Sequence, residues 1–408
     1  MTSTCDAPPT GRTRIPRVVW VLALSIFALG TSEFIIVGLL PELSADLGVS
    51  IPQAGYLISA FAVGMIVGAP AMALATLRLP RRTTALAALV VFVLGNVAGA
   101  LADDYPVLLV ARVVTAVATA TFWVVATVVT VSVVGPGARA RALAVLLAGL
   151  TVSNIVGIPL GTLIGQEFGW RASFWAVALV AALGLVGVAT TLRDGTDGGA
   201  PGNPATEFAV FRQGRLWLAL GTVALYQSAV IGMFSYVAPL LTEVSGVESG
   251  WVPVVLLGYG VGSLAGVLIG GRLGDAHPWS TLFGALSAVV VLLVLVALLA
   301  PVAAVVVVLV MVLGLVSFVA AAPLNARVFA LAGAAPTLAS STNTAAFNVG
   351  NSVGPALGGA AIAGGLGWTA PSWLGAGLAA GAIGVGLVSW RLDARDARGA
   401  TTSGARAR

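Results

Sequence analysis

The chain has 408 residues, of which 59% are hydrophobic and only 9% are charged, and its mean hydropathy is +1.04. A water-soluble fold cannot bury so much apolar side chain, so composition alone predicts a membrane protein. The formal net charge is +5, but the arginines are spread through short turns instead of gathering on one face, which argues against binding to nucleic acid.

Apolar stretches long enough to cross a bilayer, about 20 residues each, follow one another along the chain. They predict an all-α polytopic membrane protein with twelve transmembrane helices. The expected helices cover residues 18–40, 52–76, 84–101, 106–133, 142–165, 174–192, 216–240, 252–271, 279–300, 302–331, 338–363 and 371–390.

Residues 193–214 divide these helices into two sets of six. The stretch is rich in glycine and proline and carries charges, which is typical of a linker. We expect six-helix bundles at residues 18–192 and 215–391, a polar tail at residues 1–17 and a disordered tail at residues 392–408.

Charges are divided unevenly between the two ends of the predicted helices. The turns after the first, third, fifth and seventh helices carry a single arginine, Arg171, against seven acidic residues: Glu42, Asp46, Asp103, Asp104, Glu167, Glu243 and Glu248. The even-numbered turns and both tails hold nearly all the other arginines. The positive-inside rule therefore predicts a plasma (inner) membrane protein with both termini and the linker in the cytoplasm.

Rare residue types exclude several kinds of enzyme. The chain has no lysine, so it can form neither a Walker A phosphate loop nor a Schiff base. One cysteine, Cys5, and one histidine, His277, leave no thiolate zinc site, CxxC redox pair or HExxH motif. We therefore expect a protein that is not an enzyme and that uses no metal ion and no cofactor.

The two predicted bundles share a pattern of glycine and proline. The fifth helix contains Gly157-Ile-Pro159-Leu-Gly161, and the eleventh contains Gly354-Pro355-Ala-Leu-Gly358-Gly359. Each run is followed at nearly the same spacing by a Gly-Trp pair. A six-plus-six duplication of this kind is the expected architecture of many secondary transporters, whose substrate site lies between the halves near the middle of the membrane.

These features resemble the major facilitator superfamily over essentially the whole chain. The turn after the second helix resembles that family's cytoplasmic motif, Gly-x-Leu-Ala-Asp-Arg-x-Gly-Arg-Arg, although Leu77 stands in place of the aspartate and Pro80 in place of the second glycine. The second half keeps the acid, as Asp275, and lacks the arginines. The resemblance implies gating roles for Arg78, Arg81, Arg82, Gly157, Pro159, Gly161, Asp275, Gly354, Pro355, Gly358 and Gly359.

Other motifs resemble one branch of that family, the twelve-helix drug:proton exporters. They are an arginine inside the fourth helix, Arg112, and the runs TSEFIIVGLLPEL, SAFAVGMIVGAP and AFNVGNSVGPALGG. Together they resemble the subgroup that contains actinobacterial chloramphenicol-resistance permeases and arabinose-type sugar efflux permeases. The resemblance implies a monomeric antiporter that works by alternating access.

Glu33 is the only carboxylate within the twelve predicted spans. Glu33 and Arg112 each lie about seven residues from the same membrane boundary, or roughly 10 Å deep. Because a charge alone in hydrocarbon is costly, we expect the two side chains to form an ion pair that couples transport to protons. The alternatives are that Glu33 snorkels or caps a broken helix, and that Arg112 holds backbone carbonyls.

Aromatic and amide side chains on other spans are candidates for the substrate site, because an apolar wall with a few hydrogen-bonding groups suits an uncharged lipophilic ligand. For each of them the alternative is helix packing or an interhelical hydrogen bond. The candidates are Phe34, Phe61, Phe122, Trp123, Tyr226, Gln227, Phe234, Tyr236, Asn343, Phe347, Asn348 and Asn351.

The sequence thus predicts a proton-coupled exporter of a small amphiphilic drug, chloramphenicol being the best candidate. Its expected partners are that small molecule, protons and membrane lipid. Efflux of sugars or nucleosides is the alternative within the same class. An integral membrane enzyme would need clustered reactive side chains at membrane depth, and a channel would not need the bent, duplicated helices.

Overall fold

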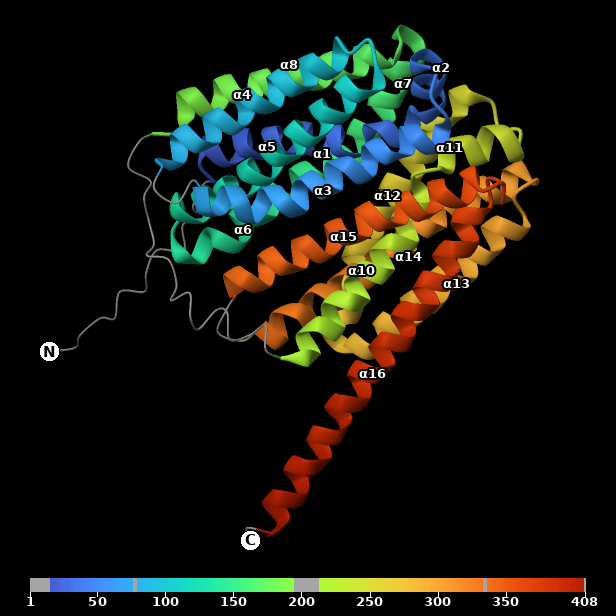
Figure 1. The fold of residues 1–408 in the computed structure, drawn as a ribbon. Helices are drawn as coiled ribbons and strands as arrows, with labels where there is room; N and C mark the ends of the chain where they lie inside the picture. The colour runs from blue at the N-terminus through green and yellow to red at the C-terminus, as the bar shows by residue number, and fades with distance from the viewer. Residues whose placement is uncertain (1–14, 76–78, 194–212, 333–335, 407–408) are drawn as a thin grey trace, which may run out of the picture.

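The computed structural model describes residues 15–75, 79–193, 213–332 and 336–406. These residues form helices joined by short turns, and no strand occurs among them. Figure 1 shows two helical bundles packed against each other, one containing α1 to α8 and the other α10 to α16. The all-α prediction is therefore confirmed.

The N-terminal half contains six spans, two of which are built from several helical segments. In chain order its elements are α1 Arg17–Phe34, η1 Ile35–Gly38, α2 Leu40–Leu47, α3 Ile51–Ala75, α4 Arg81–Ala100, α5 Tyr105–Ser132, η2 Pro136–Ala138, α6 Arg139–Val152, η3 Ser153–Gly157, α7 Ile158–Phe168 and α8 Trp170–Thr191.

The C-terminal half repeats this plan. Its elements are α10 Gly214–Phe234, α11 Val237–Pro239, η5 Leu240–Val244, η6 Ser249–Trp251, α12 Val252–Ala276, α13 Pro278–Leu298, α14 Ala303–Ala332, α15 Pro336–Ala363 and α16 Ala370–Arg406. Within the described part of the chain, 11 spans are long and apolar enough to cross a membrane. The remaining long helix, α15, is richer in asparagine, serine and threonine than the others.

The first span of each half is interrupted, where the sequence predicted continuous helices. α1 ends at Phe34 and α10 ends at Phe234, each followed by a few residues of 3-10, π or short helix. A proline follows closely in both cases, Pro41 and Pro239. Since proline has no N–H and crowds the preceding turn, it leaves earlier carbonyls without their regular partners. The duplication predicted from the sequence therefore extends to these breaks.

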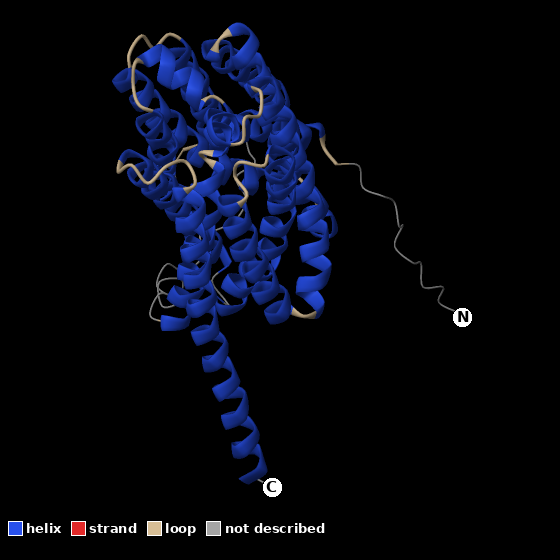
Figure 2. Cartoon of the chain, turned by 90° about the vertical axis from the view of Figure 1, so that its right-hand side faces the viewer, coloured by secondary structure: helices blue, strands red, loops and turns tan. Residues whose placement is uncertain are grey.

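The end of the chain differs from the prediction of a disordered tail. α16 continues from the membrane span through Arg391 to Arg406 as one helix, and Figure 2 shows it projecting beyond the bundle. Alanine and arginine, which are common in this stretch, are strong helix formers. The predicted linker is largely outside the described residues, as are the N-terminal tail and Arg78.

The two ends of the bundle are named here by their charges. The acidic end contains the turns at residues 42–50, 101–105, 166–171, 243–251 and 363–370, and the arginine end is the opposite one. α3 packs against α15, and α12 packs against α7 and η3, to join the two halves. Within the described part of the chain, side-chain hydrogen bonds cross between the halves from Ser59 to the Ser352 carbonyl, from Gln166 to the Ser249 carbonyl and from Asn351 to Glu33.

The closest approach of α3 to the other half is made possible by glycine. A Cβ on Gly55 would lie 2.2 Å from the hydroxyl oxygen of Tyr236, and one on Gly359 would lie 2.5 Å from the same atom. The Tyr236 hydroxyl donates to the Pro355 carbonyl at 2.9 Å. A single tyrosine thus fills the space between α3 and α15, one turn inside the acidic end.

Candidate functional site

A buried arginine lies at the centre of the polar residues in the N-terminal half. Arg112, on α5, is 1% exposed. Its guanidinium donates to the backbone carbonyl of Ser32 at 2.6 Å and to that of Glu33 at 2.9 Å. These carbonyls belong to the last turn of α1, where a helix leaves acceptors without intrahelical donors. A cation there is also favoured by the helix dipole.

Two further contacts hold Arg112 in place. The guanidinium carbon lies 4.3 Å from the ring centroid of Phe61 on α3, in a cation–π arrangement. One nitrogen also lies 3.4 Å from the Ser32 hydroxyl, which donates to Asn96 on α4 at 3.1 Å. Arg112 therefore ties α1, α3 and α5 together, and the sequence-based alternative that it holds backbone carbonyls describes its bonds.

The predicted ion pair between Glu33 and Arg112 is not formed. Arg112 binds the backbone of Glu33, while the Glu33 carboxylate accepts a hydrogen bond from Asn351 on α15 at 3.3 Å. The side-chain oxygen of Asn351 in turn accepts from Gln227 on α10 at 2.8 Å. The break in α1 explains the difference, because it presents carbonyls to Arg112 and leaves the carboxylate facing the other half.

A continuous chain of polar contacts results. It begins at Asn96 and passes through Ser32, Arg112 and Glu33 in the N-terminal half. It then crosses to Asn351 and Gln227 in the C-terminal half. Glu33 occupies the crossing point, five residues before the end of its span at Gly38. Partners of this kind make the burial of polar groups in hydrocarbon tolerable, although the Nε of Arg112 is buried and has no hydrogen-bond partner among the described residues.

Two other amides on α15 lie nearer the arginine end and retain free acceptors. Asn343 donates to Asn325 on α14, and Asn348 donates to the Thr344 carbonyl at 3.0 Å. The side-chain oxygens of Asn343 and Asn348 are buried and have no partner among the described residues. An unpaired buried acceptor is costly, so both oxygens are suited to receive a donor from a ligand or from water.

The predicted aromatic residues are not gathered in one place. Tyr226 donates to the Ser317 carbonyl, so its hydroxyl, like that of Tyr236, is occupied within the C-terminal half. Phe234 stacks on Tyr259 with ring centroids 4.2 Å apart. Phe122 is fully buried, and Phe34, Trp123 and Phe347 pack partly buried against the main core. Of the predicted aromatic set, Phe61 is the one in direct contact with Arg112.

The predicted gating glycines are packing points between helices. Gly157 faces Thr31 and Gly161 faces Ile35, both on the first span. In the other half Gly354 and Gly358 lie against α10 and Tyr236. The fifth span thus packs on the first in one half as α15 packs on α10 in the other. Pro159 and Pro355 are buried within these helices.

The remaining gating candidates lie at the arginine end. Arg82 donates to the Ala189 carbonyl near the end of α8 at 3.0 Å. Arg81 is half-buried at the start of α4, and Asp275 is exposed near the end of α12. No group of three or more histidine, cysteine or acidic side chains that could hold a metal ion occurs among the described residues.

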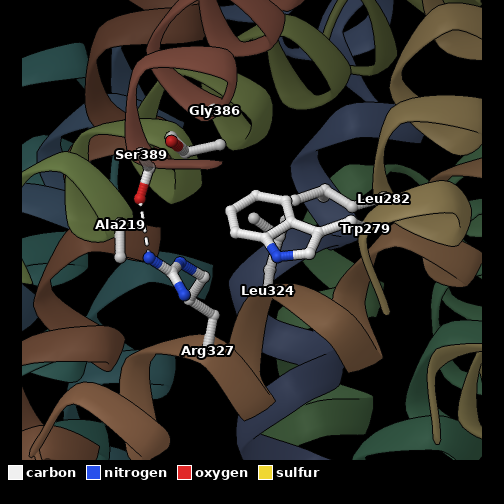
Figure 3. Close-up of a pocket in the computed structure, with 8 residues that line it drawn as sticks. Ala219, Trp279, Leu282, Leu324, Arg327, Gly386 and Ser389 are labelled. Atoms are coloured by element: carbon white, nitrogen blue, oxygen red, sulfur yellow. Dashed lines mark hydrogen bonds between the residues drawn. The ribbon is translucent and has the colours of Figure 1, made fainter. Parts of the chain in front are cut away.

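A second charged cluster was not anticipated from the sequence. Arg327 on α14 pairs with Asp393 at 2.7 Å, donates to Ser389 at 2.9 Å and lies over the ring of Trp279. Arg215, at the start of α10, also reaches Asp393, at 3.4 Å. Figure 3 shows Arg327, Ser389 and Trp279 around a small pocket at this end. Asp393 had been placed in the expected disordered tail.

Asn96 and Gln166 were also missed by sequence reasoning. Asn96 is an amide inside a predicted span, and the same criterion that singled out the asparagines of α15 would have identified it. Gln166 gives no such signal, because it lies beside the predicted turn at Glu167 and its bond to the other half depends on the fold.

Comparison with known proteins places the chain among membrane transporters. A sequence model described as "Major Facilitator Superfamily" matches residues 22–345. The chain is 39% identical over 362 residues to the "Chloramphenicol resistance protein" of Streptomyces lividans, covering 88% of this chain and 92% of that protein. It is 37% identical to "Inner membrane transport protein YdhP" of Escherichia coli K12, covering 85% of this chain and 89% of that protein. It is 30% identical to "Putative transporter AraJ" of the same strain, covering 86% of this chain and 89% of that protein.

A solved structure shares the fold. It is the crystal structure of a bacterial homolog to human lysosomal transporter, Spinster, in an inward-facing and occupied conformation. The TM-score is 0.75 at 18% sequence identity, and the match covers 92% of this chain and 96% of that one.

Proposed function

The chain belongs to the Major Facilitator Superfamily, and from that membership we propose that it exports a small amphiphilic drug in exchange for protons. It is a multi-pass transporter of the inner membrane and not an enzyme. The observation that carries the proposal is the hydrogen bond from Asn351 to the Glu33 carboxylate, which joins the two halves beside a buried arginine.

The arginine end faces the cytoplasm in this proposal. The positive-inside rule supports that orientation, because the turns of the acidic end carry a single arginine, Arg171, whereas nearly all the other arginines belong to the opposite end and the tails. The hydrogen bonds that Ser59, Gln166 and Asn351 make to the opposite half lie from the middle of the bundle toward the acidic end. The conformation would then be closed toward the outside, as is expected of a carrier ready to accept substrate from the cytoplasm.

Protonation of Glu33 supplies the coupling. An ionised carboxylate is a strong acceptor for the Asn351 amide, whereas a protonated one is weaker because charge-assisted hydrogen bonds are roughly twice as strong as neutral ones. A conformation that keeps the Glu33–Asn351 bond and one that breaks it therefore bind a proton with different affinity. That difference is what allows a proton gradient to drive a change of conformation.

The free acceptors of α15 favour an uncharged ligand with hydroxyl or amide N–H groups. Asn343 and Asn348 each present a buried oxygen without a partner. Both charges near this site, on Glu33 and Arg112, are already engaged, which disfavours a strongly charged ligand. Chloramphenicol has donors of the required kind, and the name of the Streptomyces relative supports it as the first candidate. Sugars and nucleosides, with more hydroxyls, are the alternative that the same amides support.

The test is transport into everted membrane vesicles under an imposed proton gradient. We expect chloramphenicol accumulation that a protonophore abolishes and that Glu33→Gln removes. Glu167→Gln, an exposed glutamate at the end of α7, is the matched control and should transport normally. Protonophore-insensitive accumulation, or full coupling in Glu33→Gln, would refute the role of Glu33. Coupled uptake of a sugar without uptake of the drug would favour the alternative substrate.

A further inference from the structure

A buried amide on α4, Asn96, lies behind the site and has no role in the export step described above. It is 1% exposed. Its side-chain nitrogen donates to the Phe92 carbonyl, one turn earlier in the same helix, at 2.9 Å. Because a carbonyl can only accept, this bond fixes the orientation of the amide. The Oδ1 atom of Asn96 is therefore the end that faces α1, where it accepts a hydrogen bond from Ser32.

Ser32 differs from the other hydroxyl residues of α1 in its bonding. Ser25 and Thr31 each donate to the backbone carbonyl four residues earlier, which is the usual bond of a hydroxyl inside a helix. Ser32 donates instead to Asn96, on a different helix, at 3.1 Å. A hydroxyl has one hydrogen to donate, so the Ser32 oxygen is left as an acceptor, and a nitrogen of Arg112 lies 3.4 Å from it.

The helix that carries Asn96 is firmly supported at this depth. A Cβ on Gly95 would lie 2.5 Å from the side chain of Thr115 on α5, so α4 and α5 approach closely beside Asn96. The Thr115 hydroxyl donates to the Arg112 carbonyl at 2.9 Å. α8 packs on α4 as well. One closely packed pair of helices thus carries both groups that bind the last turn of α1, Asn96 and Arg112.

These bonds determine where the Glu33 carboxylate points. Arg112 holds the backbone carbonyls of Ser32 and Glu33, and Asn96 holds the side chain of Ser32. Successive side chains of a helix point about 100° apart. Fixing Ser32 against α4 therefore directs Glu33 away from α4, toward Asn351 on α15, which donates to its carboxylate.

We propose that Asn96 is a positioning residue for the coupling site, which acts through Ser32 to hold the last turn of α1 so that the Glu33 carboxylate meets Asn351. Such support is needed because α1 ends at Phe34, and a continuing α-helix does not hold this turn from the other side. The inference rests on the proposed role of Glu33 in proton coupling. Asn96 itself exchanges no proton and contacts no ligand.

The expected effect of losing the Asn96–Ser32 bond has a definite sign. The hydrogen bond from Asn351 and the nearby charge of Arg112 both favour the ionised form of Glu33. A turn that is no longer held weakens both interactions. Glu33 should then take up its proton at a pH about one unit higher, which is the shift expected for the loss of one of the weaker hydrogen bonds to a charged group.

Arg112 is the charged group that faces this turn. Among the described residues, the other titratable side chains of α1 and of the helices packed on it lie within about two turns of a helix end. They are Arg17, Tyr56, Tyr105, Arg139, Arg141, Glu167 and Arg171. The sequence of α15 contains no titratable residue. A shift in the titration of Glu33 would therefore report on the held turn and its contacts with Arg112 and Asn351.

The experiment follows the protonated carboxyl group of Glu33 by infrared difference spectroscopy as the pH is varied, with the full chain in lipid nanodiscs. The band is identified by its absence from Glu33→Gln. We expect Asn96→Leu and Ser32→Ala each to move the titration midpoint upward by about one pH unit. Ser25→Ala is the matched control, since Ser25 is equally buried on α1 but bonds within its own helix, and it should titrate like the native chain.

The double variant Ser32→Ala/Asn96→Leu separates positioning from stability. Replacing both partners of a buried hydrogen bond by apolar groups is nearly neutral for stability, so the double variant should unfold close to the native midpoint. Its titration should still be shifted by the same amount as in each single variant, because all three lack the same bond. An unshifted titration in these variants, or shifts that add in the double variant, would overturn the proposal.

Transport into everted vesicles distinguishes a failure of this inference from a failure of the proposed function. If the native chain shows no proton-coupled accumulation of chloramphenicol but the titration of Glu33 shifts as expected, the proposed function is wrong and the positioning by Asn96 stands. If the native chain accumulates the drug with protons while Asn96→Leu and Ser32→Ala titrate like the native chain, the positioning role is wrong and the proposed function stands.

Discussion

Replacement of Arg112 by lysine tests whether the two hydrogen bonds of the arginine to backbone carbonyls of α1 stabilise the site, or whether a positive charge at this position is sufficient. Lysine keeps the positive charge but offers a compact ammonium group, which cannot reproduce the planar fork that reaches two carbonyls and lies over Phe61. One hydrogen bond to a charged donor, worth about 1.5–3 kcal/mol, should be lost. Part of a buried cation–π contact, about 2 kcal/mol when complete, should be lost with it.

We therefore expect Arg112→Lys to lower the free energy of unfolding by roughly 2–4 kcal/mol, combining these two contributions. The measurement is reversible unfolding in mixed micelles, followed by tryptophan fluorescence. Arg171→Lys serves as the comparison, because Arg171 also donates to a carbonyl, that of Ala102, and lies over a ring, that of Trp170, but at a partly exposed site. Exposed ion pairs contribute about 0–1 kcal/mol and exposed cation–π contacts about 0.5–1 kcal/mol, so its loss should be smaller.

A double-mutant cycle with Phe61→Leu isolates the contact with the ring. If the guanidinium acts through the geometry described, Arg112→Lys and Phe61→Leu should be coupled by about 1–2 kcal/mol. Additive effects, or an Arg112→Lys protein as stable as the native one, would refute the reasoning. The result would then show that any cation at this depth is sufficient.

Three other outcomes are expected. Gly55→Ala should separate the two halves at the acidic end, because its Cβ would lie 2.2 Å from the Tyr236 hydroxyl. The distance between spin labels at Leu101→Cys and Leu366→Cys, exposed turn positions of opposite halves, should lengthen, and adding Tyr236→Phe should partly shorten it again. Asp46→Asn should lower the midpoint of thermal unfolding at neutral pH, since hydrogen bonds from Trp170 and Arg171 lower the pKa of Asp46. A lowered pKa means that the ionised carboxylate stabilises the fold at neutral pH and that this stabilisation is lost as the pH falls through that pKa. The midpoints of the native protein and the variant should therefore converge in acid. Asp393→Asn should destabilise the C-terminal half by about 1–3 kcal/mol, because Arg327 loses its ionic partner. An unchanged midpoint of thermal unfolding would show that this ion pair does not stabilise the fold.

The course of the chain through the membrane was predictable because hydropathy and turn residues act locally. The helix bounds agree with the prediction to within a few residues in most spans. The breaks after Phe34 and Phe234 were not predicted, although Pro41 and Pro239 stood close by. A proline signals strain in the preceding turn, but only packing decides whether the helix bends, changes to a 3-10 or π geometry, or ends.

The sequence allowed the main residues of the site to be predicted, but not the hydrogen bonds between them. Matching depths brought Glu33 and Arg112 together correctly, because rise per residue is fixed in any helix. Which oxygen the guanidinium binds depends on the break in α1, which frees two carbonyls. Asn351 was predicted as a substrate contact, yet it binds Glu33. Contacts between residues more than 300 positions apart depend on how the two halves meet, and no local pattern records that.

The uninterrupted course of α16 offers a practical attachment point for imaging. A compact membrane protein of this kind has little mass outside the lipid to guide particle alignment. A rigid helical domain fused to α16 within the stretch that ends at Arg406 would inherit the orientation of the transmembrane bundle. Each residue of a helix adds about 1.5 Å of length and a rotation of roughly 100° about the helix axis. Adding or removing single residues at the junction would therefore change the direction of the fused domain in steps of roughly 100°.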